Sequence, residues 1–179
     1  MRRALIVLAA ALAGFGGHAI AADTDAMAKT VRGFYAAYQT FHPSDGIPGA
    51  DGRAKYAPYT SASLNALLVQ AAGAEDQFVH ANKDSPPLIE GDLFSSNFEG
   101  ATSIKVGACS GDGKTGRCAI DLTYADGKDK PLNWTDTAYL ANGADGWRVD
   151  DIGYGGNGDF GNKGRMRDTL KMAISEAAD

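Results

Sequence analysis

Two carboxylates among apolar residues, in what read as neighbouring β-strands, are the residues best placed to do chemistry. Asp136 lies two residues after Trp134, so both side chains point to the same face of one strand. Asp151 comes four residues after Trp147 in the next strand and lies on the same face if the alternation continues. Two carboxylates that face one cavity can have raised pKa values and act as an acid/base pair. The pair therefore defines a candidate catalytic site.

A structural role is the alternative for these acids, and the sequence favours it. Acids among apolar residues commonly bond to an arginine, a tyrosine hydroxyl or a backbone donor, and Arg148 and Tyr38 are the candidate partners. No complete catalytic constellation accompanies the acids, so we assign no catalytic residue. The residues that we expect around a ligand are Tyr38, Trp134, Asp136, Trp147 and Asp151.

Metal and cofactor chemistry is poorly represented in the chain. After residue 21 the only histidines are His42 and His80, and zinc sites usually need three or four ligands. Residues 153–158 match G-x-G-x-x-G, but the 21 residues that follow read as one helix. A dinucleotide site needs a second strand and an acidic residue after that motif. We therefore expect no metal and no cofactor.

The two cysteines, Cys109 and Cys118, flank a Gly-rich turn between two predicted strands and are expected to form a disulfide. Strict alternation places Cys109 and Val106 on opposite faces of the first strand, while Cys118 points to the apolar face of the second. A disulfide needs both cysteines on one side of the sheet. A bulge at residues 107–108 would reconcile the two patterns; otherwise Val106 faces outward.

Two-residue alternation and the turn residues between apolar runs predict four strands. The strands are Thr102–Cys109, Arg117–Ala125, Leu132–Ala141 and Gly146–Tyr154. The connections between them are short and rich in Gly and Asp, so neighbouring strands are antiparallel. They predict a curved antiparallel meander of at least four strands.

Apolar residues at helical spacing predict helices before and after this sheet. The first begins at residues 23–25 and ends at His42-Pro43, and the second is capped at residues 60–63. Residues 44–59 are punctuated by Pro and Gly and are expected to form a loop. A short C-terminal helix begins near Met166. The predicted fold class is α+β, with the N-terminal helices packed on one face of the meander.

Residues 1–21 read as a signal peptide. Arg2 and Arg3 precede an apolar run at residues 5–15 that is too short to span a bilayer. Ala19-Ile20-Ala21 then has the small-x-small pattern of a cleavage site. Cleavage leaves residues 22–179 as a single domain with no membrane anchor, and we expect it in the periplasm.

The chain that remains after this cleavage is acidic. Without Arg2 and Arg3, 15 basic residues stand against 22 acidic ones, a net charge of −7. Nucleic acids and anionic membranes attract basic surfaces, so neither is expected as a partner. A basic envelope protein or a small apolar ligand is compatible with this charge.

Three stretches carry a resemblance to a known family: Phe34–Tyr38, Glu90–Ser96 and Gly146–Ile152. With the order of helices and strands, they resemble a family of exported bacterial proteins of unknown function within the nuclear-transport-factor-2-like superfamily. The resemblance covers roughly residues 30–175 and implies a cystatin-like cone, in which helices pack into a curved sheet. It implies no catalytic residue, and the wider superfamily includes isomerases, dehydratases and non-catalytic binding domains.

These observations predict a non-catalytic periplasmic binding protein that recognises a protein or a small apolar ligand. An immunity or inhibitor protein that blocks an envelope enzyme is one form of this function. The alternative is a small cofactor-free isomerase- or hydrolase-type enzyme that uses Asp136 or Asp151. A deep pocket that contains both acids, with no arginine neutralising them, would favour the enzyme, and a filled cone would favour recognition of a protein by the surface.

Overall fold

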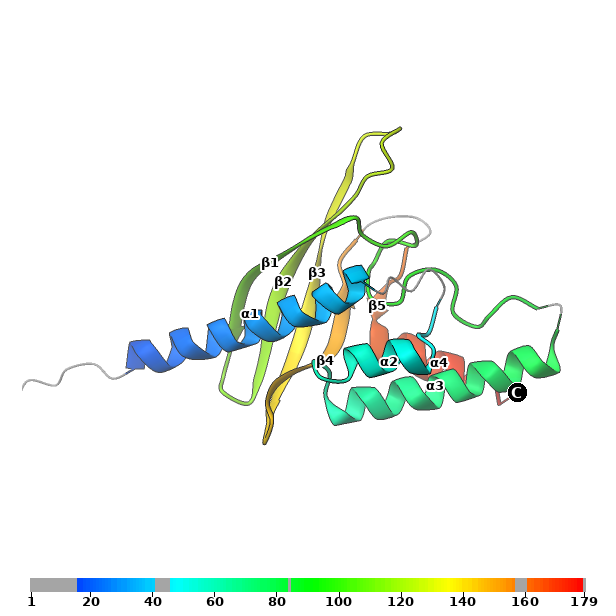
Figure 1. Ribbon diagram of the computed structural model, residues 1–179, viewed down its shortest axis with the longest axis horizontal. Coiled ribbons are helices and arrows are strands. Elements are labelled where there is room, and N and C mark those ends of the chain that lie inside the picture. Colours follow the sequence, from blue (N-terminus) through cyan, green and yellow to red (C-terminus); the bar gives the residue numbers. More distant parts are fainter. Residues whose placement is uncertain (1–15, 41–45, 84, 157–160, 179) are drawn as a thin grey trace, which may run out of the picture.

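The computed structural model has an α+β fold, as predicted (Figure 1). It describes residues 16–40, 46–83, 85–156 and 161–178, and their side chains from residue 23 onward. The elements in chain order are α1 (Gly16–Thr40), α2 (Ala50–Tyr56), α3 (Ala62–Ala81), β1 (Ser103–Gly111), β2 (Thr115–Tyr124), β3 (Leu132–Gly143), β4 (Gly146–Tyr154), β5 (Gly164–Arg165) and α4 (Met166–Glu176).

The five strands form one antiparallel sheet in chain order, so the predicted meander is confirmed. The four predicted strands are present, with ends that differ by at most two residues from those expected. β5 was not predicted, because a strand of two residues carries no alternation pattern.

One face of the sheet is covered by α1, which crosses it in Figure 1. Alternate residues of β2 and β3 point to this inner face and are buried, among them Ile120, Leu122 and Leu140. The α1 residues that recur at helical spacing are also buried: Met27, Val31, Phe34, Tyr35 and Tyr38. Helix and sheet therefore share one filled core.

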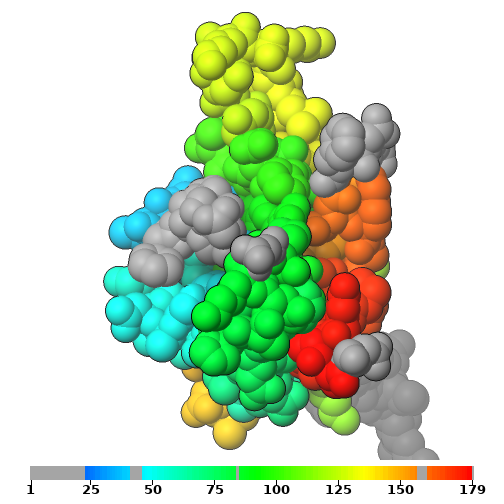
Figure 2. All heavy atoms as spheres, turned by 90° about the vertical axis from the view of Figure 1, so that its right-hand side faces the viewer, coloured from blue at the N-terminus to red at the C-terminus, as the bar shows by residue number. Residues whose placement is uncertain are grey.

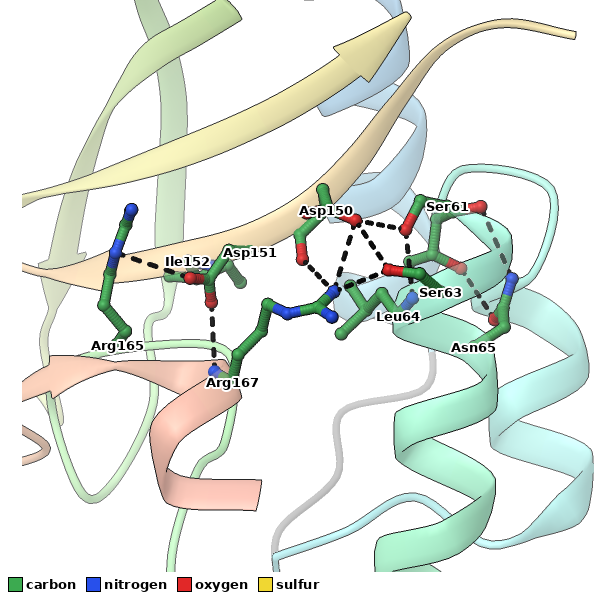
Figure 3. A network of polar contacts seen from close by, with 10 residues as sticks. Ser61, Ser63, Leu64, Asn65, Asp150, Asp151, Ile152, Arg165 and Arg167 are labelled. Carbon is green, nitrogen blue, oxygen red and sulfur yellow. Dashed lines mark hydrogen bonds and ion pairs between the residues drawn. The ribbon is translucent and has the colours of Figure 1, made fainter. Parts of the chain in front are cut away.

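A polar network joins α3 and α4 to β4 (Figure 3). The Ser61 hydroxyl accepts a hydrogen bond from Leu64 N (3.0 Å) and donates one to Asp150 Oδ1 (2.5 Å). Ser61 is thus the N-cap of α3, within the range predicted to cap that helix. From α4, Arg167 Nη1 donates to the same Asp150 oxygen (3.2 Å). Asp150 therefore ties two helices to the edge of the meander.

Two helical predictions need correction. Residues 44–59 are not a continuous loop, because α2 occupies Ala50–Tyr56; seven residues interrupted by Gly52 were too few to show a helical pattern. Helix α1 begins at Gly16 rather than near residue 23 and so crosses the predicted cleavage site. Within the described residues, no helix combines the length and the apolar composition needed to cross a membrane.

Candidate functional site

Asp136 is completely buried, and its carboxylate connects three separate segments of the chain. Oδ2 accepts hydrogen bonds from the backbone N–H of Ser96 (2.8 Å) and from the indole Nε1 of Trp134 (3.2 Å). Oδ1 accepts from the backbone N–H of Gly155 (2.8 Å) and from the Ser96 hydroxyl. Each oxygen therefore has two donors, which is typical of a buried carboxylate that is held in place.

A hollow of about 420 Å³ lies beside this carboxylate. It is lined by Ser96, Asn97, Leu132, Asn133, Trp134, Thr135, Gly155 and Gly156. Three of these residues are the donors to Asp136, so the carboxylate fixes the walls of the hollow. Among the described residues, no charged side chain lines it, and Leu132 is 47% exposed at its rim. The geometry suits an uncharged ligand or segment more than acid/base chemistry.

A second buried acid, Asp92, was not among the predicted site residues. Asp92 Oδ2 accepts a hydrogen bond from the Tyr38 hydroxyl, and Oδ1 accepts one from Phe94 N (2.7 Å). Burial raises the pKa of Asp92 to about 7, although these hydrogen bonds act in the opposite direction. Burial and the nearby Asp92 carboxylate also raise the pKa of Tyr38. The hydrogen bond between Tyr38 and Asp92 therefore holds the irregular segment 91–101 against α1.

The predicted partners of Asp136 and Asp151 are therefore wrong. Tyr38 bonds to Asp92, and Arg148 Nη1 donates to the carbonyl oxygen of Trp147 (2.8 Å). Ser96 and Asp92 were missed because segment 91–96 is irregular and shows no period. The only signal from it was the stretch Glu90–Ser96 quoted for the family resemblance.

Asp151 does not share a face with Asp136, contrary to the prediction. Tyr139 pairs with Asp151 while Leu140 pairs with Val149, so Asp150 is an extra residue that reverses the alternation. Asp151 consequently points to the outer face with Tyr139.

The Asp151 carboxylate is also neutralised on that outer face. Its Oδ2 lies 3.4 Å from Arg165 Nε, and the Arg165 guanidinium stacks 3.5 Å from the centre of the Tyr139 ring. Burial raises the pKa of Asp151, and the backbone N–H of Arg167 and the Arg165 charge oppose that rise. The two acids therefore do not meet in one pocket.

Trp147 does not meet Trp134 either. Trp147 pairs with Asn142, eight residues along β3 from Trp134, which corresponds to roughly 27 Å of strand. Trp147 is buried against α1, and its Nε1 lies 3.4 Å from Asp23 Oδ1. Of the five predicted ligand residues, the structure brings Trp134 and Asp136 together.

The disulfide between Cys109 and Cys118 is present, and so is the bulge that it required. The two Cα atoms are 4.1 Å apart, and the cysteines pair directly across β1 and β2. Val106 pairs with Ile120, so residues 107–108 stand opposite the single residue between Ile120 and Cys118. The predicted disulfide and the bulge that the phase of the cysteines predicted are both confirmed.

Two other motifs add no site. In the part of the chain that the structure describes, no cluster of three His, Cys, Asp or Glu side chains could hold a metal ion. Gly153 of the G-x-G-x-x-G match lies in β4 and Gly155 follows it, whereas residues 157–158 lie outside the described residues.

Comparisons of the chain with protein-family models, curated proteins and solved structures find no match.

Proposed function

We propose that this chain is a non-catalytic binding protein that recognises a partner protein through its surface. The observation that carries the proposal is that the inner face of the sheet is filled by α1, while the Trp134 hollow opens at the surface. Small apolar ligands are usually enclosed in pockets that bury most of their area. An open hollow beside an exposed Leu132 better suits a contact with another protein.

The arrangement of the acids weighs against the alternative enzyme. Asp136 and Asp151 point to opposite faces of the sheet, so they cannot act on one substrate as a pair. Asp136 already accepts four hydrogen bonds and has no exposed oxygen. A general acid or base needs an oxygen within reach of the substrate.

The proposed setting is the bacterial envelope, reached through a signal peptide cleaved near Ala21. The disulfide is consistent with an oxidising compartment. The helices packed against an antiparallel meander are compatible with the cystatin-like cone of the nuclear-transport-factor-2-like superfamily. An immunity or inhibitor protein would be one form of this binding function.

Site-specific photo-crosslinking tests the proposal. A photoreactive amino acid replaces Leu132 at the hollow, and in a control chain it replaces Val69, which is 56% exposed on α3. We expect one discrete protein adduct in the producing cells from position 132, none from position 69, and loss of the adduct in Trp134→Ala. Absence of an adduct that depends on Trp134, with circular dichroism showing a folded variant, would contradict the proposal.

A further inference from the structure

A second hollow, of about 430 Å³, lies toward the end of the sheet that is farther from Trp134. It is walled by α1, by the residues that follow α2 and by the start of β4, and we call it the Arg148 hollow. Trp147, which lines it, is roughly 27 Å from Trp134 along the strands. The turn between β3 and β4 reaches the lower end of the molecule in Figure 2, whereas the β2–β3 hairpin projects at the upper end. The Arg148 hollow and the Trp134 hollow are therefore separate sites.

The Arg148 hollow carries positive charge in an acidic protein. Its charged lining residues, among those that the structure describes, are Lys29 of α1 and Arg148 of β4. Neither forms an ion pair with a carboxylate of the described chain. Asp23, which contacts the Trp147 indole, does not line this hollow. Two cations without an opposing acid favour an anionic ligand at this place.

Arg148 is held in place and still has hydrogen-bond donors to offer. Its Nη1 donates to the carbonyl oxygen of Trp147 (2.8 Å), and the Thr30 hydroxyl donates to the same oxygen (3.1 Å). A guanidinium has five N–H donors, and within the described residues that of Arg148 makes no other hydrogen bond. The rest of its planar fork can therefore bind a carboxylate through two parallel hydrogen bonds.

An aromatic wall stands beside these cations. Tyr59 lines the hollow, and its carbonyl oxygen accepts a hydrogen bond from Val149 N (2.8 Å), which fixes its backbone against β4. The Tyr59 ring lies against Gly33 of α1, where a Cβ would collide with the ring carbons. Trp147, which is buried, lines the hollow as well. The wall is thus formed before any ligand binds, and a flat apolar group can pack on it.

We propose that the Arg148 hollow binds a small organic carboxylate with a flat apolar body, such as an aromatic acid. The carboxylate pairs with Arg148 and Lys29, and the body packs beside Tyr59. The volume of the hollow falls within the range of roughly 300–1,000 Å³ that is typical of ligand sites with apolar walls and a few polar groups. Charge-assisted hydrogen bonds are stronger than neutral ones, so this ligand does not need the enclosure that a purely apolar ligand requires. The site is additional to the partner contact proposed above.

Matched probes separate the two parts of this recognition. Benzoate, naphthoate and indole acetate each carry a carboxylate on a flat ring, and their primary amides keep the ring without the charge. Inorganic phosphate supplies negative charge without a ring. The readout is a titration followed by NMR, in which the backbone amide signal of Tyr59 reports on the Arg148 hollow and that of Trp134 reports on the other hollow.

Three substitutions of a cation by glutamine test the residues. Arg148→Gln and Lys29→Gln each remove one of the two charges of the hollow. Lys29 is exposed on α1, so its replacement leaves the fold intact even if Arg148→Gln does not. Arg117→Gln is the matched control, because Arg117 is an exposed arginine of β2 that does not line this hollow. Circular dichroism checks that each variant is folded.

We expect at least one acid to shift the Tyr59 signal and not that of Trp134, and its amide and phosphate to bind about tenfold more weakly or less tightly still. Arg148→Gln should weaken binding of that acid about tenfold, Lys29→Gln about threefold because Lys29 is exposed, and Arg117→Gln less than about twofold. Equal binding of acid and amide, or of acid and phosphate, overturns the inference. So does the absence of a Tyr59 shift at millimolar acid, or unchanged affinity in both Arg148→Gln and Lys29→Gln.

Discussion

Asp136 positions the walls of the hollow, because its carboxylate accepts four hydrogen bonds from the residues that line it. Its oxygens hold Ser96, Gly155 and the indole of Trp134, which come from segment 91–101, the end of β4 and β3. Hydrogen bonds to a buried charged group each contribute about 1.5–3 kcal/mol, and an unsatisfied donor adds a penalty. The shape of the hollow therefore depends on a residue that does not line it.

Asp136→Asn should lower the free energy of unfolding by about 2–3 kcal/mol, because the amide places a donor among groups that themselves donate. Urea denaturation measures this change. Asp121→Asn is the matched control: Asp121 accepts one hydrogen bond, from Thr135 Oγ1 (3.0 Å), and is exposed, so its loss should cost less than 1 kcal/mol. Equal effects of the two substitutions would contradict the positioning role.

Asp92 should make stability depend on pH with a sign opposite to that of an ion-paired acid. Its pKa is about 7 in the folded protein and near 3.9 when unfolded, so the folded chain holds the proton more tightly. The associated stability is complete below pH 4 and is lost as the pH rises through 7. Over that window the loss amounts to about 4 kcal/mol.

Asparagine does not titrate, so Asp92→Asn removes this pH dependence. The free energy of unfolding of the variant, relative to that of the unchanged protein, should therefore rise by about 4 kcal/mol between pH 4 and pH 8. Urea unfolding at intervals across this range measures the difference. The shifts of other acids, including the exposed Asp112 and Asp126 with lowered pKa, cancel in the comparison. Parallel curves for the two proteins would show that Asp92 does not carry the dependence.

At the scale of elements, the two-residue alternation of apolar side chains predicted the strands correctly, but it predicted the wrong face for side chains that follow a bulge. Residues 132–141 and 146–149 follow the period of two, so Trp134 and Asp136 were placed on one face correctly. The extra residue Asp150 then reversed the phase of Asp151, and no residue type marks a bulge at that position. The bulge in β1 was predictable because the cysteines supplied a second constraint.

The hairpin of β1 and β2 gives a prediction about its disulfide. Cys109 and Cys118 close a short loop, for which the entropic model gives about 2–3 kcal/mol of stabilisation. The double variant Cys109→Ala/Cys118→Ala should therefore melt at a lower temperature and still fold, because α1 and β3 hold the hairpin as well. Thermal denaturation followed by circular dichroism measures this, and an unfolded double variant would contradict it.

A thiol titration checks the pairing itself. The unchanged protein, unfolded without reductant, should show no reactive thiol, because both cysteines are in the bond. After reduction, the same protein should show both thiols, which confirms that the reagent reaches them.

At the scale of the molecule, the described contacts between the side chains of α1 and the sheet come from residues after the predicted cleavage site. Among the side chains that the structure describes, from residue 23 onward, the first buried one in α1 is Met27, and Asp23 Oδ1 lies 3.4 Å from Trp147 Nε1. Cleavage after Ala21 would shorten α1 and leave these contacts in place. The acidic residues 23 and 25 would then lie in the first turn of the helix, where negative charge is favourable.

Export is therefore expected to release a mature protein that begins at Ala22 or Asp23. Mass spectrometry of the protein purified from the periplasmic fraction should give the mass of residues 22–179 or 23–179, less two hydrogens for the disulfide. Ala21→Arg is the control, because a large charged residue at the cleavage site should block processing and leave the full-length chain with the membrane fraction. A cytoplasmic protein that keeps residues 1–21, with both thiols reduced, would contradict the export and the envelope setting together.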